Sequence, residues 1–173
     1  MKIYLACSLT HLPQQHFGRY VSYLHALAAS LRGIGGVEAV KYALLDSDPQ
    51  LKERPPERRA ELCYAWDRQM IEDADLVVAD ASFPSTGMGV ELQIAEGAGK
   101  PIIMLVGDYG DNRVPSREYE NPDHSRHHLQ VGEGVVSLMA LGVPTISQVI
   151  QYACEVEAIQ KASEAVALFV RPS

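Results

Sequence analysis

The chain has 173 residues, of which 47% are hydrophobic and 21% charged, a composition typical of one soluble globular domain. Its 15 lysine and arginine residues against 22 aspartate and glutamate residues give a net charge of −7, which excludes the basic surface that polymeric nucleic acid requires. The sequence has no apolar run of roughly 18 residues to span a membrane and no signal-peptide pattern at its start. Its three cysteines are widely spaced, as is typical of reduced thiols. We therefore expect a single cytoplasmic domain over residues 1–173.

Short β-rich runs alternate with longer helical runs along the chain, which is the pattern of βαβ units around a parallel sheet. Strands are predicted at about Lys2–Cys7, Val37–Leu44, Asp75–Asp80, Pro101–Val106 and Thr145–Gln151. Helices are predicted at about Gln14–Arg32, Glu57–Asp73, Met88–Gly99, Gly134–Leu141 and Glu155–Phe169. The fold class is therefore α/β. We expect a flavodoxin-like, doubly wound parallel sheet of five strands in the order 2-1-3-4-5.

Two polar segments separate these elements. Asp46–Arg59, with the adjacent prolines Pro55 and Pro56, predicts a loop that leads into a helix. Gly107–Gly132 is long, polar and rich in Gly, Pro, Asp and Asn, which predicts an extra irregular loop. Such loops are usually either functional lids or disordered, and the histidines in this one are read as solvated side chains rather than metal ligands.

In this strand order the ligand crevice opens at the carboxyl ends of the first and third strands. The turn after the first strand, Cys7–His11, has neither a glycine-rich dinucleotide loop nor a Walker lysine. The first strand also ends without the paired acids of a phospho-acceptor domain. Three common functions of α/β proteins are thereby disfavoured.

An acidic residue interrupts the apolar face of the helix before the third strand. Cys63, Trp66, Met70 and Ile71 form a stripe at helical spacing, and Asp67 falls in its middle. Unpaired burial of a carboxylate is costly. Asp67 is therefore either a structural residue bonded to its neighbours or part of a polar site.

A second acid is predicted on the helix after the third strand. This helix follows a Gly87-x-Gly89 turn, and Glu91 shares its sheet-facing side with Ile94 and Ala95. Glu91 is predicted in the first helical turn, near the positive end of the helix dipole. Either the dipole merely stabilises a terminal glutamate, or it keeps the carboxylate ionised and directed into the crevice, as a nucleophile requires.

Two segments around these acids resemble the signature of the nucleoside 2-deoxyribosyltransferase superfamily. They are Asp67-x-x-Met70-Ile71-x-x-Ala74-Asp75-Leu76-Val77-Val78-Ala79 and Pro84-Ser85-x-Gly87-x-Gly89-x-Glu91-Leu92. Within that group they are most similar to the deoxynucleoside 5′-monophosphate N-glycosidases, in which an acid lies 24 residues, and a serine six residues, before the glutamate. Asp67, Ser85 and Glu91 meet both spacings. The nucleoside-using transferases have an aspartate in place of Ser85, so the resemblance favours nucleotides.

The resemblance extends to both ends of this region. Tyr4 matches the first-strand tyrosine that touches the nucleophile in the family, and Ser8 matches a serine that the hydrolases use for phosphate. Ser137 and Met139 match the hydrolases' Ser-x-Met, a segment that enters the neighbouring subunit's site. The hydrolases' phosphate-binding arginine is replaced by Thr10. The sequence leaves open which residue supplies the missing charge: His11, His16 or Arg19.

The resemblance implies an N-glycosidase that hydrolyses a (deoxy)nucleoside 5′-monophosphate to free base and sugar phosphate through a glycosyl-Glu91 intermediate. Asp67 is the expected acid, and Tyr4 is expected to orient Glu91. The expected substrate-binding residues are Ser8, Ser85, Gly87, Gly89, Ser137 and Met139. A transferase that exchanges bases on the same site, and a non-catalytic nucleotide-binding module, are the alternatives. The expected partners are a small nucleotide or nucleoside and a second copy in a homodimer with shared sites, with no metal and no organic cofactor.

Overall fold

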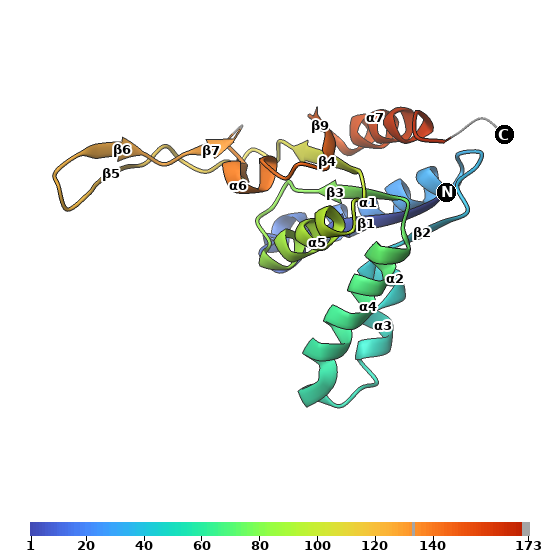
Figure 1. Ribbon diagram of the computed structural model, residues 1–173. Coiled ribbons are helices and arrows are strands. Elements are labelled where there is room, and N and C mark those ends of the chain that lie inside the picture. The colour runs from blue at the N-terminus through green and yellow to red at the C-terminus, as the bar shows by residue number, and fades with distance from the viewer. Residues whose placement is uncertain (133, 171–173) are drawn as a thin grey trace.

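A central parallel sheet with helices on both faces forms the body of the protein in the computed structural model, which describes residues 1–132 and 134–170 (Figure 1). The strand order is β2-β1-β3-β4-β9, and every neighbouring pair is parallel. The strands are Lys2–Cys7 (β1), Ala39–Lys41 (β2), Leu76–Asp80 (β3), Ile102–Gly107 (β4) and Ile146–Tyr152 (β9). This order confirms the predicted flavodoxin-like α/β fold.

Four long helices cover the two faces of the sheet. They are Gln14–Arg32 (α1), Arg59–Asp73 (α4), Thr86–Gly97 (α5) and Glu155–Ala167 (α7). Buried side chains of α1 and α7 pack on one face, and those of α4 and α5 pack on the other. The residues of β1 alternate between the two, since Ile3 and Leu5 join the first cluster and Tyr4 and Ala6 join the second. Among the described residues, no helix is both long and apolar enough to cross a membrane.

The predicted start of the helix that carries Glu91 was two residues late. Helix α5 begins at Thr86 because Ser85 is its N-cap, with its Oγ accepting a hydrogen bond from the Met88 backbone N–H at 3.2 Å. The predicted helix Gly134–Leu141 is also shorter than expected. Only Leu138–Leu141 (α6) is helical, because the residues before it turn back to pair as a short strand.

The segment Asp46–Arg59 is not the plain loop that was predicted. It carries the short helices Asp48–Leu51 (α3) and Pro56–Arg58 (η1), and it follows the short helix Ala43–Asp46 (α2), which begins where the second strand was predicted to end. The Asp46 carboxylate closes the first turn by accepting hydrogen bonds from the Tyr42 backbone N–H and the Lys41 ammonium group. This turn ends the second strand earlier than predicted and brings α3 against α4.

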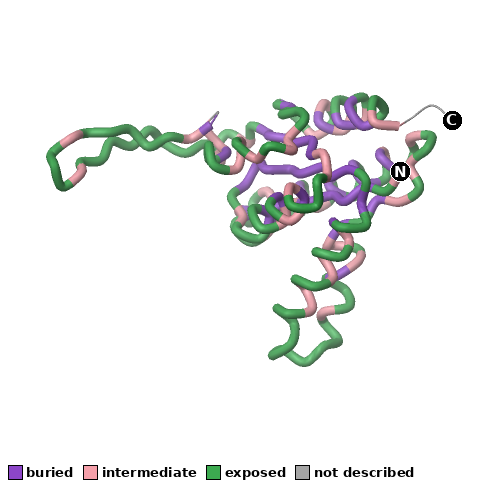
Figure 2. Tube along the Cα trace, in the orientation of Figure 1, coloured by how far each residue is buried: buried purple, intermediate pink, exposed green. Residues whose placement is uncertain are grey.

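The segment Gly107–Gly132 is irregular only in part, since residues 108–117 have no regular secondary structure but short strands follow them. Glu118–Glu120 (β5) and Arg126–His128 (β6) form an antiparallel hairpin, and Val131–Gly132 (β7) pairs with Val136–Ser137 (β8). The turn that joins the hairpin strands has His124 at a φ of 64°, and it is closed by backbone hydrogen bonds from the Asn121 N–H to the Ser125 carbonyl oxygen and from the His124 N–H to the Asn121 carbonyl oxygen. Figures 1 and 2 show this arm projecting from the sheet with most of its length exposed.

Candidate active site

Glu91 meets Tyr4 at the crevice where the order of the sheet reverses. The Tyr4 hydroxyl donates a hydrogen bond to Glu91 Oε1 at 2.5 Å, and Tyr4 is fully buried. The contact forms because Tyr4 lies on the face of β1 that α5 covers, and because Glu91 shares the sheet-facing side of α5 with the buried Met88 and Leu92. The structure thus brings together the two residues that the sequence predicted would touch.

Burial, rather than the helix dipole, governs the charge of Glu91. Glu91 is the sixth residue of α5, and no acid lies in the first turn, so its predicted place in that turn was wrong. Desolvation raises the pKa of Glu91 to about 7, the negative charge of Asp67 adds to this, and the hydrogen bond from Tyr4 acts in the opposite direction. The carboxylate therefore changes charge near neutral pH.

Asp67 lies on the flank of α4 that faces Glu91 and is held by two donors. The Ser47 hydroxyl donates to Asp67 Oδ1 at 2.7 Å, and the Cys63 thiol to Oδ2 at 3.4 Å. Burial and then the charge of Asp67 raise the pKa of Cys63 to about 12, so this thiol stays protonated as a donor. Ser47 is 1% exposed and was missed by the sequence reasoning, because a serine in a polar segment carries no periodic signal.

A cavity of about 530 Å³ opens beside the start of α5. Ser85, Gly89 and Ser137, three of the predicted substrate-binding residues, line it together with His11. Ser137 reaches this cavity within its own chain, whereas the family resemblance implied a neighbour's site. The volume of the cavity lies in the range of about 300–1,000 Å³ that is usual for small-molecule sites.

Other predicted site residues lie outside this cavity. Ser8 is buried behind its wall, where its hydroxyl donates to the Met88 sulfur at 3.5 Å. Gly87 and Met139 do not line the cavity, and Met139 is 88% exposed on α6.

Tyr4, Asp67 and Glu91 also lie outside this cavity, toward α4. Met88 and Leu92, which flank Glu91 along α5, both line the cavity, so the Tyr4–Glu91 pair lies beside the cavity along this helix.

A buried carboxylate that the sequence reasoning did not single out ends β3. Asp80 accepts hydrogen bonds from the hydroxyls of Tyr20, Tyr23 and Tyr152 at 2.8–2.9 Å. The next polar residue, Ser82, accepts a bond from the Gly107 backbone N–H at 2.7 Å. The network ties the loop before Ser85 to α1, β4 and β9. The sequence did contain a signal for this buried carboxylate, because Asp80 directly follows four apolar residues of the third strand.

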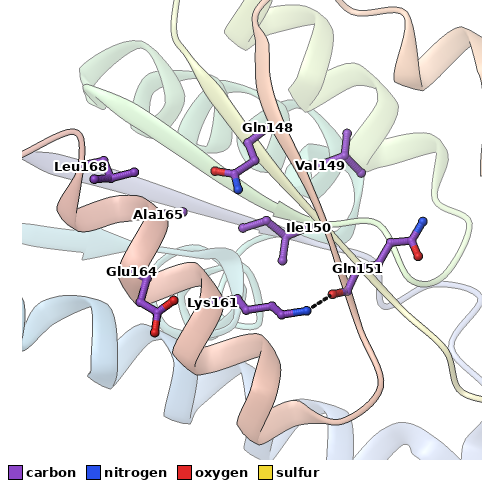
Figure 3. Close-up of a pocket in the computed structure, with 8 residues that line it drawn as sticks. All are labelled: Gln148, Val149, Ile150, Gln151, Lys161, Glu164, Ala165 and Leu168. Atoms are coloured by element: carbon purple, nitrogen blue, oxygen red, sulfur yellow. Dashed lines mark hydrogen bonds between the residues drawn. The ribbon is translucent and has the colours of Figure 1, made fainter.

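A second surface cavity, of about 650 Å³, lies between the edge strand β9 and α7 (Figure 3). Lys161 crosses its floor and donates to the Gln151 carbonyl oxygen at 2.9 Å. None of the predicted site residues line this cavity, and we assign it no role. Within residues 1–132 and 134–170, no cluster of three or more His, Cys, Asp or Glu side chains is arranged to hold a metal ion.

A flavodoxin-like sheet with a buried tyrosine–glutamate pair at its switch point, and a second carboxylate on the adjacent helix, defines an α/β protein with a candidate carboxylate nucleophile. The family model for nucleoside 2-deoxyribosyltransferase matches residues 3–139, and the chain belongs to this family. The family is one of enzymes that act on small nucleosides or nucleotides.

The chain also resembles a Syntrophotalea carbinolica protein whose name assigns it provisionally as a 2′-deoxynucleoside 5′-phosphate N-hydrolase. The two are 37% identical over 59 residues, which are 34% of this chain and 42% of that relative. Among solved structures, the CMP N-glycosidase BcmB of Clostridium botulinum shares the fold with a TM-score of 0.57 and 18% identity over 95% of this chain and 99% of its own. A conserved protein of Enterococcus faecalis V583 also shares the fold. Its TM-score is 0.60, and it is 16% identical over 95% of this chain and 98% of its own.

Proposed function

We propose that this protein is an N-glycosidase that hydrolyses a (deoxy)nucleoside 5′-monophosphate to free base and sugar phosphate. The buried Tyr4–Glu91 pair carries the proposal, because a carboxylate held by a tyrosine in a desolvated crevice suits attack on a sugar carbon. The name of the Syntrophotalea carbinolica relative supports hydrolysis of a 5′-phosphate substrate.

The proposed reaction runs through a covalent intermediate on Glu91. In the reactive form Glu91 is ionised and Asp67 carries the one proton of the pair. A carboxylate oxygen of Glu91 bonds to C1′ of the sugar as the C1′–N bond breaks, and the departing base keeps that electron pair and takes the proton from Asp67, which becomes a carboxylate. Water then attacks C1′, the ester bond returns its electron pair to Glu91, and Asp67 takes the proton of the water. Tyr4 orients Glu91, while Ser47 and Cys63 hold Asp67 toward it.

The 5′-phosphate is proposed to bind at the start of α5. Glu91 is the sixth residue after Ser85, a spacing that corresponds to about 9 Å along a helix axis. A sugar whose C1′ meets Glu91 can therefore extend its 5′ end toward Ser85, with backbone N–H groups of the first turn nearby. Because Ser85 Oγ accepts a bond from the Met88 N–H, its own hydroxyl hydrogen is free to donate to a phosphate oxygen.

The Ser85→Asp variant tests this placement. We expect it to reduce kcat/KM for a 5′-monophosphate at least about tenfold more than for the matching nucleoside, because a second negative charge repels the phosphate. Aspartate is also a good N-cap, so α5 should persist. Ser85→Ala is the control that removes the hydroxyl without adding charge. Equal losses on both substrates in Ser85→Asp would argue against a phosphate contact.

Base exchange is the second candidate reaction, because the matching family model is that of a transferase. The protein should be incubated with 2′-deoxynucleosides, ribonucleosides and their 5′-monophosphates, each with and without a second free base, and the products separated by chromatography. We expect sugar phosphate and free base from a monophosphate. A new nucleoside that forms only with the second base would instead establish the transferase, and no cleavage of any substrate would contradict both.

The active unit is proposed to be a cytoplasmic homodimer in which α6 of one copy reaches the site of the other. The exposed apolar side chains of α6, Leu138 at 51% and Met139 at 88%, support a partner on this surface. The three free cysteines favour a reducing compartment.

The Met139→Glu variant tests the dimer. Placing a charge on this surface should weaken association, so we expect the sedimentation coefficient at assay concentration to fall from that of a dimer to that of a monomer. Val156→Glu on α7, where the side chain is 76% exposed, is the matched control and should remain dimeric. A wild-type protein that is monomeric and fully active would refute the shared site.

A further inference from the structure

The cavity beside the start of α5 is lined by few polar groups and a single titratable one. Its walls are mostly apolar, and the polar side chains on them belong to Ser85, Thr86, Gln130, Ser137 and His11. Of the described residues that line it, only His11 can carry a charge. No other acid or base of the described chain therefore competes with His11 for a ligand inside this cavity.

The neighbouring cations are engaged elsewhere. His16 Nε2 lies 2.8 Å from Asp111 Oδ1, and the Arg19 guanidinium bonds Glu155 Oε2 at 2.6 Å. Arg113, next to the lining residue Val114, bonds the Asp108 carboxylate at 2.8 Å. By contrast, no hydrogen bond or ion pair within the described part of the chain engages the imidazole of His11. The sequence left open whether His11, His16 or Arg19 supplies the charge of the missing phosphate-binding arginine. Of these three, only His11 has no partner in the described structure.

The negative charges near Glu91 determine on which side of α5 a phosphate can bind. Glu91 and Asp67 both lie on the α4 side of α5, and the negative charge of Asp67 already raises the pKa of Glu91. A phosphate dianion is repelled from that side and favoured on the other, where the cavity holds hydroxyls, first-turn backbone N–H groups and an imidazole. An imidazole N–H donates to phosphate oxygens, and protonation of the ring adds a positive charge.

We propose that His11 determines specificity for the 5′-phosphate of the substrate, by donating a hydrogen bond to that phosphate in the cavity that His11 and Ser85 both line. This inference rests on the function proposed above, and it names the residue that contacts the phosphate of the substrate. Ser85, the first-turn N–H groups of α5 and the exposed imidazole of His11 bind the same phosphate.

Equilibrium binding separates this role from catalysis. In a Glu91→Gln background, calorimetric titrations would use 2′-deoxynucleoside 5′-monophosphates and the matching nucleosides. Adding His11→Ala should weaken monophosphate binding at least about tenfold and change nucleoside binding less than about twofold, because only the phosphate loses a partner. His11→Arg should restore monophosphate binding to within about threefold, since a guanidinium can replace the imidazole as a phosphate donor.

His128→Ala is the matched control, because His128 is an exposed histidine on β6 that does not line the cavity, and it should leave both affinities unchanged. Monophosphate binding that survives His11→Ala would overturn the assignment of His11 while leaving the glycosidase untouched. A wild-type protein that binds monophosphates through His11 but cleaves none would support the assignment and overturn the proposed function. A wild-type protein with no preference for monophosphates over nucleosides would overturn the assignment of His11.

Discussion

The Glu91→Gln variant is expected to fold and to lose at least about 10³-fold in turnover of a proven substrate, because the amide cannot form the covalent bond to C1′. Its oxygen can still accept the hydrogen bond from Tyr4, so the crevice should keep its geometry. In the wild-type protein, kcat/KM should fall tenfold for each pH unit below about 7, where the raised pKa of Glu91 removes the nucleophilic carboxylate.

The same substitution should make the protein more stable at alkaline pH. The folded-state pKa of Glu91 is raised from 4.5 to about 7, so its contribution to stability is complete below about 4.5 and is lost as pH rises through about 7. At pH 8, Glu91→Gln should therefore raise the free energy of unfolding by about 1–3 kcal/mol. Denaturant titration measures this, with the exposed Glu53→Gln as control. An active Glu91→Gln enzyme would refute the assigned nucleophile.

The Asp67→Asn variant is expected to reduce hydrolysis by about 10²–10⁴-fold, the usual contribution of a general acid. The loss should be smaller for substrates whose base leaves readily without a proton, whereas Glu91→Gln should be equally inactive on all of them. Steady-state rates across a series of bases measure this difference. Asp73→Asn lies on the same helix, bonded to Gln69, and should behave as wild type. An Asp67→Asn loss that is the same for every base would assign Asp67 a structural role instead.

The part of the site that lies on regular elements could be predicted from the sequence. Helical spacing placed Asp67 on the inner face of α4, where the structure has it partly buried among Cys63, Trp66 and Met70. Alternation along β1 and the sheet-facing side of α5 made a contact between Tyr4 and Glu91 possible, and the family resemblance made it an expectation. The bounds of β1 and α1 agree with the predicted ones because apolar periodicity and the glycines after Arg32 mark them clearly.

The rest of the site depends on contacts that no local pattern encodes. Ser47 reaches Asp67 across 20 residues because two unforeseen helical turns, α2 and α3, bring it there. His11 and Ser137 meet at one cavity only because the extra segment folds as an arm whose base returns to the sheet end. The predicted effect of the helix dipole on Glu91 was wrong for another reason, because the helix start was placed at Met88 rather than at Thr86. The N-cap at Ser85 moves Glu91 out of the first turn, so burial and Asp67 replace the dipole as causes.

The most direct test of the account is to trap the glycosyl-enzyme and locate its bond. A 5′-monophosphate substrate with fluorine at C2′ slows both steps, because the fluorine destabilises the oxocarbenium-like transition state, and with a readily departing base the first step should still proceed. The protein is quenched after the stoichiometric burst of base release and digested, and its peptides are analysed by mass spectrometry. We predict that the peptide containing Glu91 gains the mass of the fluorinated sugar phosphate, with fragmentation placing the ester on Glu91. A burst of base release with no added mass on this peptide, or with the sugar on another residue, would contradict the central claim that Glu91 is the nucleophile.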